Sequence, residues 1–250
     1  MKKLSLTLIC WFILAGNFAI AKEITLGYVN FPPYEFSEND QPAGILVGIV
    51  KSAFKEAGIP LKLEFLPFKR AYNDTLSERI DGLFNFYKNE ERMPLFDYTR
   101  PVIKNPLIFF VRKDSKLKFE KLEDLKGLRI GAMIGYTYGL EFDKTTLFEI
   151  DRVSSHKTNF KKLVSGRIHA YPCDKLVGIY VARKEKLMSE CIILPKPLKV
   201  MDGHIGFKKG KHPDVVEKIN SVLKKKQESG KIDKIILNWI IHNPTTTLSR

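Results

Sequence analysis

Three short apolar segments alternate with two stretches of helical spacing in the first third of the chain, and this order constrains the fold more than any other feature. The apolar segments run from Ile24 to Tyr28, from Leu61 to Phe65 and from Leu83 to Tyr87. Between them, apolar residues recur three and four positions apart, as on one face of a helix. A strand–helix–strand–helix–strand order is typical of a parallel sheet flanked by helices. We therefore predict an α/β fold.

A second strand–helix–strand–helix–strand unit is predicted farther along, without any sequence repeat that relates it to the first. A returning strand and two helices are expected to close the chain, the first of them beginning at Pro213. The expected positions are a strand at 128–134, a helix around Phe160, a strand at 167–171, a helix after Asp174, a strand at 191–194 and the returning strand at 204–207. The whole pattern predicts two α/β units in one chain.

Residues 1–21 have the pattern of a secretory signal peptide. Two lysines precede a mostly apolar run that reaches Phe18, and residues 19–21 read Ala-Ile-Ala, a cleavage signature. The run is short for a membrane span, and no later stretch of about eighteen apolar residues follows. We expect export, cleavage after Ala21 and a soluble periplasmic chain that begins at Lys22.

The formal net charge of +14 raises the possibility of a nucleic-acid partner. The lysines, however, are spread along the chain, often beside acidic residues, and the one tight run, Lys224–Lys226, lies in a helical pattern. Scattered charge of this kind is a weak signal, and export argues against such a partner. We expect no nucleic-acid binding.

Cysteines and histidines give no sign of a metal or cofactor site. Two cysteines, Cys173 and Cys191, remain after cleavage. They could form a disulfide or remain two buried thiols, and the sequence leaves both alternatives open. The five histidines lack metal-ligand spacing, and no nucleophile motif is present. We expect neither a metal nor a cofactor.

Arg92 follows the third apolar segment and is the first candidate for ligand binding. Asn89 is a good helix N-cap, and Glu90 and Glu91 suit a first helical turn, so we expect a short helix that carries Arg92. Ligands of open α/β sheets lie at the carboxyl ends of strands, where a fixed guanidinium binds a carboxylate through two parallel hydrogen bonds. The alternative is a surface ion pair between Arg92 and Glu90 or Glu91.

Six motifs occur in order over nearly the whole chain after residue 21. They are 32–36 (PPYEF), 77–82 (SERIDG), 90–92 (EER) with 96–101 (FDYTRP), 124–131 (DLKGLRIG), 165–170 (SGRIHA) and 205–210 (IGFKKG). In this order they resemble the family 3 extracellular solute-binding proteins, the amino-acid receptors of ABC importers.

The resemblance implies a type II periplasmic-binding-protein fold, in which two lobes with mainly parallel sheets are joined by two hinge crossings. The first lobe would comprise residues 22–104 and 203–250, and the second lobe residues 105–202. The family's function would be capture of an amino acid or similar small carboxylate by lobe closure, as in a Venus flytrap. A monomer would then deliver the ligand to an ABC permease in the inner membrane.

The resemblance also implies roles for individual residues. Arg92 would hold the ligand α-carboxylate with help from Thr137, and Asp174 would take the α-ammonium. The aromatic rings of Phe31 and Phe68 would stack on the ligand side chain. Further candidate lining residues are Arg70, Asn85, Tyr87 and Tyr136.

Two departures from the family pattern leave the ligand open. The strand before Arg92 usually carries small hydroxyl residues, whereas here residues 84–87 read Phe-Asn-Phe-Tyr, whose bulk narrows or reshapes the pocket. Pro172 removes a backbone donor two residues before Asp174. Asp174 also has the alternative role of a helix N-cap alone.

Two other functions remain alternatives to a transport receptor. The first is an exported enzyme on the same scaffold, similar to the cyclohexadienyl dehydratases. Such an enzyme needs a general acid, for which Glu35 is the one candidate. The second is a receptor that reports its ligand to a membrane partner.

Overall fold

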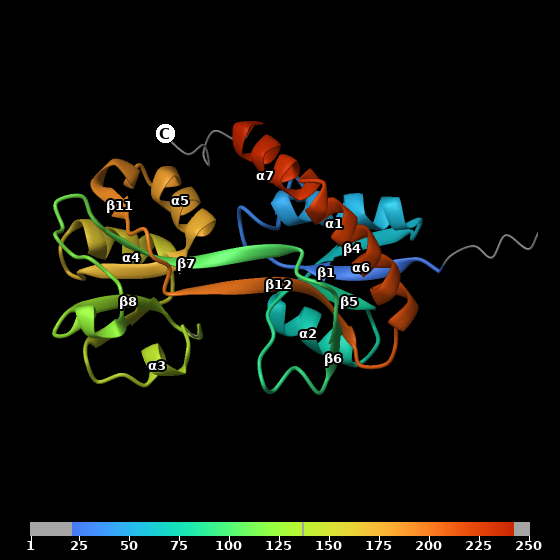
Figure 1. The fold of residues 1–250 in the computed structure, drawn as a ribbon, viewed down its shortest axis with the longest axis horizontal. Helices are drawn as coiled ribbons and strands as arrows, with labels where there is room; N and C mark the ends of the chain where they lie inside the picture. Colours follow the sequence, from blue (N-terminus) through green and yellow to red (C-terminus); the bar gives the residue numbers. More distant parts are fainter. Residues whose placement is uncertain (1–21, 137, 243–250) are drawn as a thin grey trace, which may run out of the picture.

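The structure is a computed structural model that describes residues 22–136 and 138–242, and its elements form two lobes (Figure 1). Two long strands, β7 (Ile103–Arg112) and β12 (Lys199–Lys208), run between the lobes and pair with each other in antiparallel register. The predicted signal peptide, the candidate Thr137 and the last eight residues lie outside the described residues. The predicted α/β class is confirmed.

The first lobe contains the predicted parallel unit. Strand β1 lies between β4 and β5 and pairs with both in parallel, while β5 pairs with β12 on its other side. Helices α1, α6 and α7 contact one another, and α2 lies below the sheet in Figure 1. The elements are β1 (Ile24–Tyr28), β2 (Phe36–Glu38), β3 (Gln41–Ala43), α1 (Ile45–Ala57), β4 (Leu61–Phe65), α2 (Phe68–Leu76), β5 (Gly82–Phe86), β6 (Phe96–Tyr98), α6 (Pro213–Glu228) and α7 (Lys231–His242).

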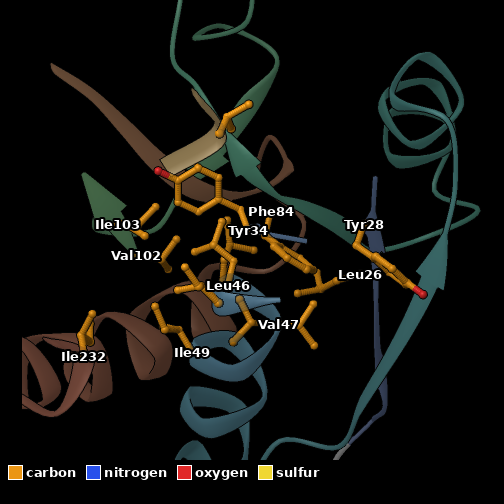
Figure 2. Packing of buried hydrophobic residues seen from close by; sticks show 14 of the residues in the cluster. Leu26, Tyr28, Tyr34, Leu46, Val47, Ile49, Phe84, Val102, Ile103 and Ile232 are labelled. Carbon is orange, nitrogen blue, oxygen red and sulfur yellow. The ribbon is translucent and has the colours of Figure 1, made fainter. Parts of the chain in front are cut away.

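Helix α1 shows how local pattern and core packing agree. Its buried side chains, among them Leu46 and Ile49, recur at helical spacing and pack against the sheet beside Leu26 and Phe84 (Figure 2). The helix ends at Gly58, whose φ of 67° is the left-handed conformation that glycine adopts without strain.

The second lobe is also built on a parallel arrangement. Strand β8 pairs in parallel with β9 and with β10, and β10 pairs antiparallel with β7. The elements are η1 (Leu122–Leu125), β8 (Arg129–Met133), α3 (Leu140–Asp143), β9 (Glu149–Val153), α4 (His156–Val164), β10 (Ala170–Asp174), α5 (Lys175–Lys184), η2 (Met188–Glu190) and β11 (Cys191–Ile193). The two lobes therefore share an architecture.

The predicted strands of this lobe need two corrections. Strand β9 is not predicted by the sequence, because it is an edge strand with no fully buried residue and hence carries a weak apolar signal. The strand expected at 167–171 begins only at Ala170, and β11 pairs antiparallel with β7 instead of extending the parallel unit. The parallel unit is thus β8-α3-β9-α4-β10.

Residues 36–43 form the hairpin β2–β3, with Asn39 and Asp40 at positive φ in its two-residue connection. The helix expected to carry Arg92 is a turn. The Asn89 side chain does accept the backbone N–H of Arg92 at 2.8 Å, but strand β6 begins at Phe96 and leaves no room for further helical turns.

The two cysteines among the described residues, Cys173 and Cys191, are buried and form no disulfide there. Over residues 22–136 and 138–242, no helix is both long enough and apolar enough to cross a bilayer.

Candidate functional site

The Arg92 side chain lies over aromatic rings from β5 and α2. Its guanidinium carbon is 4.8 Å from the centre of the Phe86 ring and 5.2 Å from that of Phe68, and Nη1 donates to the Tyr87 carbonyl at 3.1 Å. A weakly hydrated, planar guanidinium favours such stacking. These contacts hold Arg92 at the carboxyl end of β5.

The surface ion pair that the sequence left open for Arg92 does not form. Among the described residues, neither Glu90, Glu91 nor any other carboxylate lies within ion-pair distance of the guanidinium. The charge of Arg92 is therefore balanced by π faces and one carbonyl alone.

Asp174 at the start of α5 has two kinds of partner. Its Oδ1 caps the helix by accepting the backbone N–H groups of Leu176 and Val177 at 3.0 and 3.1 Å. The same oxygen accepts the Tyr34 hydroxyl at 2.8 Å, although Tyr34 belongs to the first lobe. Its Oδ2 is buried and has no hydrogen-bond partner in the part of the chain that the structure describes. Asp174 is thus a helix cap that also contacts the opposite lobe.

Burial raises the pKa of Asp174 to about 6, against the hydrogen bonds from Val177, Tyr34 and Leu176 that favour the carboxylate. The titratable groups that interact with its charge are Tyr34, Tyr87, Tyr136 and Cys173. None of these four groups is cationic.

The loop after β1 fixes Tyr34. The carbonyl oxygen of Tyr34 accepts the N–H of Leu46 in α1 at 2.8 Å, and the Tyr34 ring stacks on Phe31 with centres 5.7 Å apart. Gly44 makes this approach possible, because a Cβ there would lie 2.4 Å from the Tyr34 carbonyl oxygen. The candidate Phe31 therefore supports the residue that contacts Asp174.

Tyr87 connects Arg92 to the other polar side chains. Its hydroxyl oxygen accepts a hydrogen bond from Nδ2 of Asn105 at 2.8 Å. The same Nδ2 donates a second hydrogen bond to Oδ1 of Asn85 at 3.1 Å. Asn85 has a φ of 54°, a left-handed conformation that asparagine tolerates. Burial and the negative charge of Asp174 raise the pKa of Tyr87, against the hydrogen bond from Asn105.

Glu35 is fully buried beside this group. Its Oε2 accepts the N–H of Val29 at 3.3 Å, and Oε1 has no hydrogen-bond partner among the described residues. Burial raises the pKa of Glu35 well above its usual value, and the backbone of Val29 and the nearby side chain of Asn85 counteract the shift only in part.

Tyr136 and a small network around His156 lie on the second-lobe side. The rings of Tyr136 and His156 are 5.9 Å apart, and Nδ1 of His156 lies 2.6 Å from the Tyr171 hydroxyl and 3.5 Å from Sγ of Cys173. Burial lowers the pKa of His156 to about 4 and raises that of Cys173 well above its usual value. Both groups are therefore neutral at pH 7.

Not all sequence-derived candidates come together. Arg92, Phe68 and Tyr87 are in contact, and Phe31 reaches Asp174 through Tyr34. The structure keeps Arg70 apart. Its side chain is two-thirds exposed on α2 and pairs with Asp74 in the same helix.

Several residues of this group are not predicted by the sequence. In the sequence, Tyr34 stands only inside the motif at 32–36, and Asn105 is a polar residue inside the mostly apolar run 102–111. A buried polar residue in such a run is a usable signal, because burial of an amide requires hydrogen-bond partners. His156 carried no comparable signal. Among the described residues, no group of three or more metal-ligating side chains occurs.

The chain is similar to known proteins along nearly its whole described length. The family model for bacterial extracellular solute-binding proteins, family 3, matches residues 24–242. The L-cystine-binding protein TcyJ of Escherichia coli (strain K12) is 21% identical over 84% of this chain and 79% of its own length. The arginine-binding extracellular protein ArtP of Bacillus subtilis (strain 168) is 21% identical over 90% of this chain and 89% of its own length.

A solved structure agrees with these sequence matches. A mutant of ArgBP from T. maritima superimposes with a TM-score of 0.66 at 28% identity, covering 87% of this chain and 94% of that one. The two-lobed α/β architecture, with its flanking helices, matches such binding proteins.

Proposed function

The chain belongs to the bacterial extracellular solute-binding proteins, family 3, and we propose that it is a periplasmic receptor for an amino acid or a similar small carboxylate. Arg92 binds the ligand carboxylate, and Asp174 binds an ammonium group from the other lobe. Two relatives are named as binding proteins for L-cystine and for arginine, and both names support this class of ligand.

One observation carries the proposal: two side chains of opposite charge near Tyr87 each lack an ionic partner among the described residues. Arg92 donates to the Tyr87 carbonyl and has no carboxylate, while Oδ2 of Asp174 is buried with no donor. A zwitterion supplies the complement of each group. Burying either charge without its complement is costly, so the pair favours a ligand with both.

Lobe closure and delivery complete the proposal. We place the hinge at residues 104/105 and 202/203, where the crossing strands pair Lys104 with Asp202. The lobes are then residues 22–104 with 203–250, and residues 105–202. The chain, cleaved after Ala21, closes on its ligand as a monomer and presents it to an ABC permease. Micromolar binding supplies about 8 kcal/mol, which is ample to shift a hinge equilibrium.

A dehydratase-like enzyme is the second candidate, because the raised pKa of Glu35 suits a general acid. Turnover of a prephenate- or arogenate-like substrate tests it. The relatives named above are binding proteins, and the receptor remains our proposal.

The test of the receptor begins with native mass spectrometry of the purified protein, which identifies any small molecule that co-purifies. Calorimetric titration with that molecule, and with the standard amino acids and L-cystine, then measures affinity. Small-angle scattering at saturation should show a smaller radius of gyration. The proposal fails if no amino acid or small carboxylate binds more tightly than about 1 mM, a free energy near 4 kcal/mol.

A further inference from the structure

Helix α2 and the turn after it border an open hollow on the first lobe, which we call the α2 hollow. Its volume is about 480 Å³, and its lining residues are Pro67, Lys69, Arg70, Asn73, Asp74 and Arg79. In Figure 1, α2 lies below the sheet of the first lobe. Neither Arg92 nor Asp174 lines the hollow, so it is separate from the site that the proposed function uses.

The helical spacing of α2 places four of the lining side chains on one stripe. Lys69 and Asn73 are four positions apart, as are Arg70 and Asp74, and residues three and four apart are neighbours on a helix surface. Asp74 is only 4% exposed, whereas the side chains of Arg70 and Arg79 are 66% and 69% exposed. A buried carboxylate therefore lies beneath cations that reach solvent.

Arg79 reaches the same carboxylate from the turn after α2. Glu78 has a φ of 62°, and the backbone N–H of Arg79 donates to the carbonyl oxygen of Asp74 at 2.8 Å. Nη2 of Arg79 lies 2.6 Å from Oδ1 of Asp74, and Nε of Arg70 lies 3.4 Å from Oδ2. One buried carboxylate thus holds two guanidinium groups next to each other.

Both guanidinium groups keep unused donors and uncompensated charge. Each has five N–H donors, and the contacts with Asp74 engage only Nε of Arg70 and Nη2 of Arg79. Among the described residues, no other carboxylate forms an ion pair with either arginine. Lys69 adds a third cation and Asp74 is the one acid in the lining, so the net charge of the lining is +2. An anion with a charge near −2 complements it.

We propose that the α2 hollow is a binding site for a phosphate group. A phosphate monoester has a charge of about −1.5 to −2 at pH 7 and three acceptor oxygens, which engage two guanidinium forks where a carboxylate engages one. Arg70 and Arg79 bind the phosphate oxygens, and Lys69 and the amide of Asn73 donate to them. Because Asp74 already restrains both arginines, less side-chain freedom is lost on binding.

Inorganic phosphate tests the site directly. Amide chemical shifts and calorimetry follow its titration at pH 7.5, with sodium chloride at equal ionic strength as the reference. Phosphate should shift the amides of residues 69–79 in a saturable way, whereas chloride should not, because a spherical monovalent ion cannot engage two guanidinium forks at once.

Two variants and one control assign the response to the α2 hollow. Arg70→Gln and Arg79→Gln each remove one fork and one charge, so each should raise the half-saturating phosphate concentration by about tenfold. Arg129→Gln removes the same charge from an exposed arginine that pairs with Glu149 in the second lobe, and it should bind phosphate like the wild type. Circular dichroism verifies that each variant is folded.

Vesicles distinguish a lipid headgroup from a soluble phosphate as the source of the group. Co-sedimentation with phosphatidylcholine vesicles that contain phosphatidic acid, but not with pure phosphatidylcholine vesicles, and its loss in Arg79→Gln would support the site with a lipid as its ligand. Phosphate binding without co-sedimentation would support the site with a soluble phosphate. No saturable phosphate response, wild-type binding in both folded arginine variants, or an equal loss in Arg129→Gln would overturn the proposal, whether or not amino acids bind through Arg92.

Discussion

Replacing Arg92 by alanine removes the side chain on which the proposed carboxylate site depends. The guanidinium has two aromatic rings within 5.2 Å and one carbonyl contact, to Tyr87, and no acidic partner among the described residues. When the closed lobes exclude water, burying a ligand carboxylate without this partner costs about 3–5 kcal/mol of binding free energy. At 1.4 kcal/mol per tenfold, the dissociation constant should rise by about a hundred- to several-thousand-fold.

The same substitution should cost little stability. The stacking of Arg92 on Phe68 and Phe86 contributes about 0.5–1 kcal/mol for each ring at a partly exposed site. A loss of about 1–2 kcal/mol lowers the unfolding temperature of a chain of this length by only about 2–8 °C. The variant therefore remains folded at 25 °C, and its affinity is measurable.

Calorimetric titration of the wild type, Arg92→Ala and Arg92→Lys with the same amino acid provides the assay. Lysine keeps the charge but lacks the planar fork, so its affinity should fall between the other two. Arg129→Ala is the control, since it removes an exposed arginine that pairs with Glu149 at the far edge of the second lobe. A folded Arg92→Ala protein that binds within threefold of the wild type would refute the carboxylate assignment.

Asp174→Asn should lower the affinity for an amino-acid ligand by about a hundredfold or more while sparing the affinity for its deaminated analogue, because only the ammonium loses its countercharge. Equal losses of affinity for both ligands in calorimetric titration would mean that Asp174 is a helix cap alone. With a pKa of about 6, raised by burial, Asp174 is mostly protonated at pH 5, so ammonium binding should weaken by about tenfold between pH 7 and pH 5, and a flat profile would contradict this. Tyr34→Phe removes the first-lobe hydroxyl that donates to Asp174, so the radius of gyration of the ligand-free protein should increase in small-angle scattering. No increase would mean that this hydrogen bond does not hold the lobes together. Gly178→Ala would place a Cβ 2.2 Å from the Phe110 ring and should lower the free energy of unfolding by about 1–3 kcal/mol in urea denaturation, whereas Gly48→Ala, with its nearest neighbour atom at 3.5 Å, should not destabilise.

Local periodicity was sufficient where each element buries one face completely. In α1, the apolar spacing from Leu46 to Phe54 and the glycine at position 58 predict both the helix and its end, because side-chain burial and backbone conformation agree. Strand β9 shows the opposite case. It pairs on one side only and has no fully buried residue, so its sequence Glu-Ile-Asp-Arg-Val carries no strong pattern.

The conformation of the turn that carries Arg92 depends on the pairing of the next strand, β6. The Asn89 side chain caps the turn, as expected of asparagine. The chain does not continue as a helix, because Phe96 pairs with Lys208 of β12 and is therefore part of a strand. The local sequence pattern favours a helix, but strand pairing with a residue far along the chain determines the conformation.

The sequence by itself determined the α/β class, the order of most elements and two charged candidates, Arg92 and Asp174, whose ligand roles remain predictions. Only the tertiary structure decided which side chains surround them. The hydrogen bond from Tyr34 to Asp174 joins residues 140 positions apart, and Asn105 reaches Tyr87 from a strand that runs between the lobes. Periodicity reports which face of an element is buried, but such contacts depend on how separate elements are placed against one another, and that placement is set by the packing of the whole core.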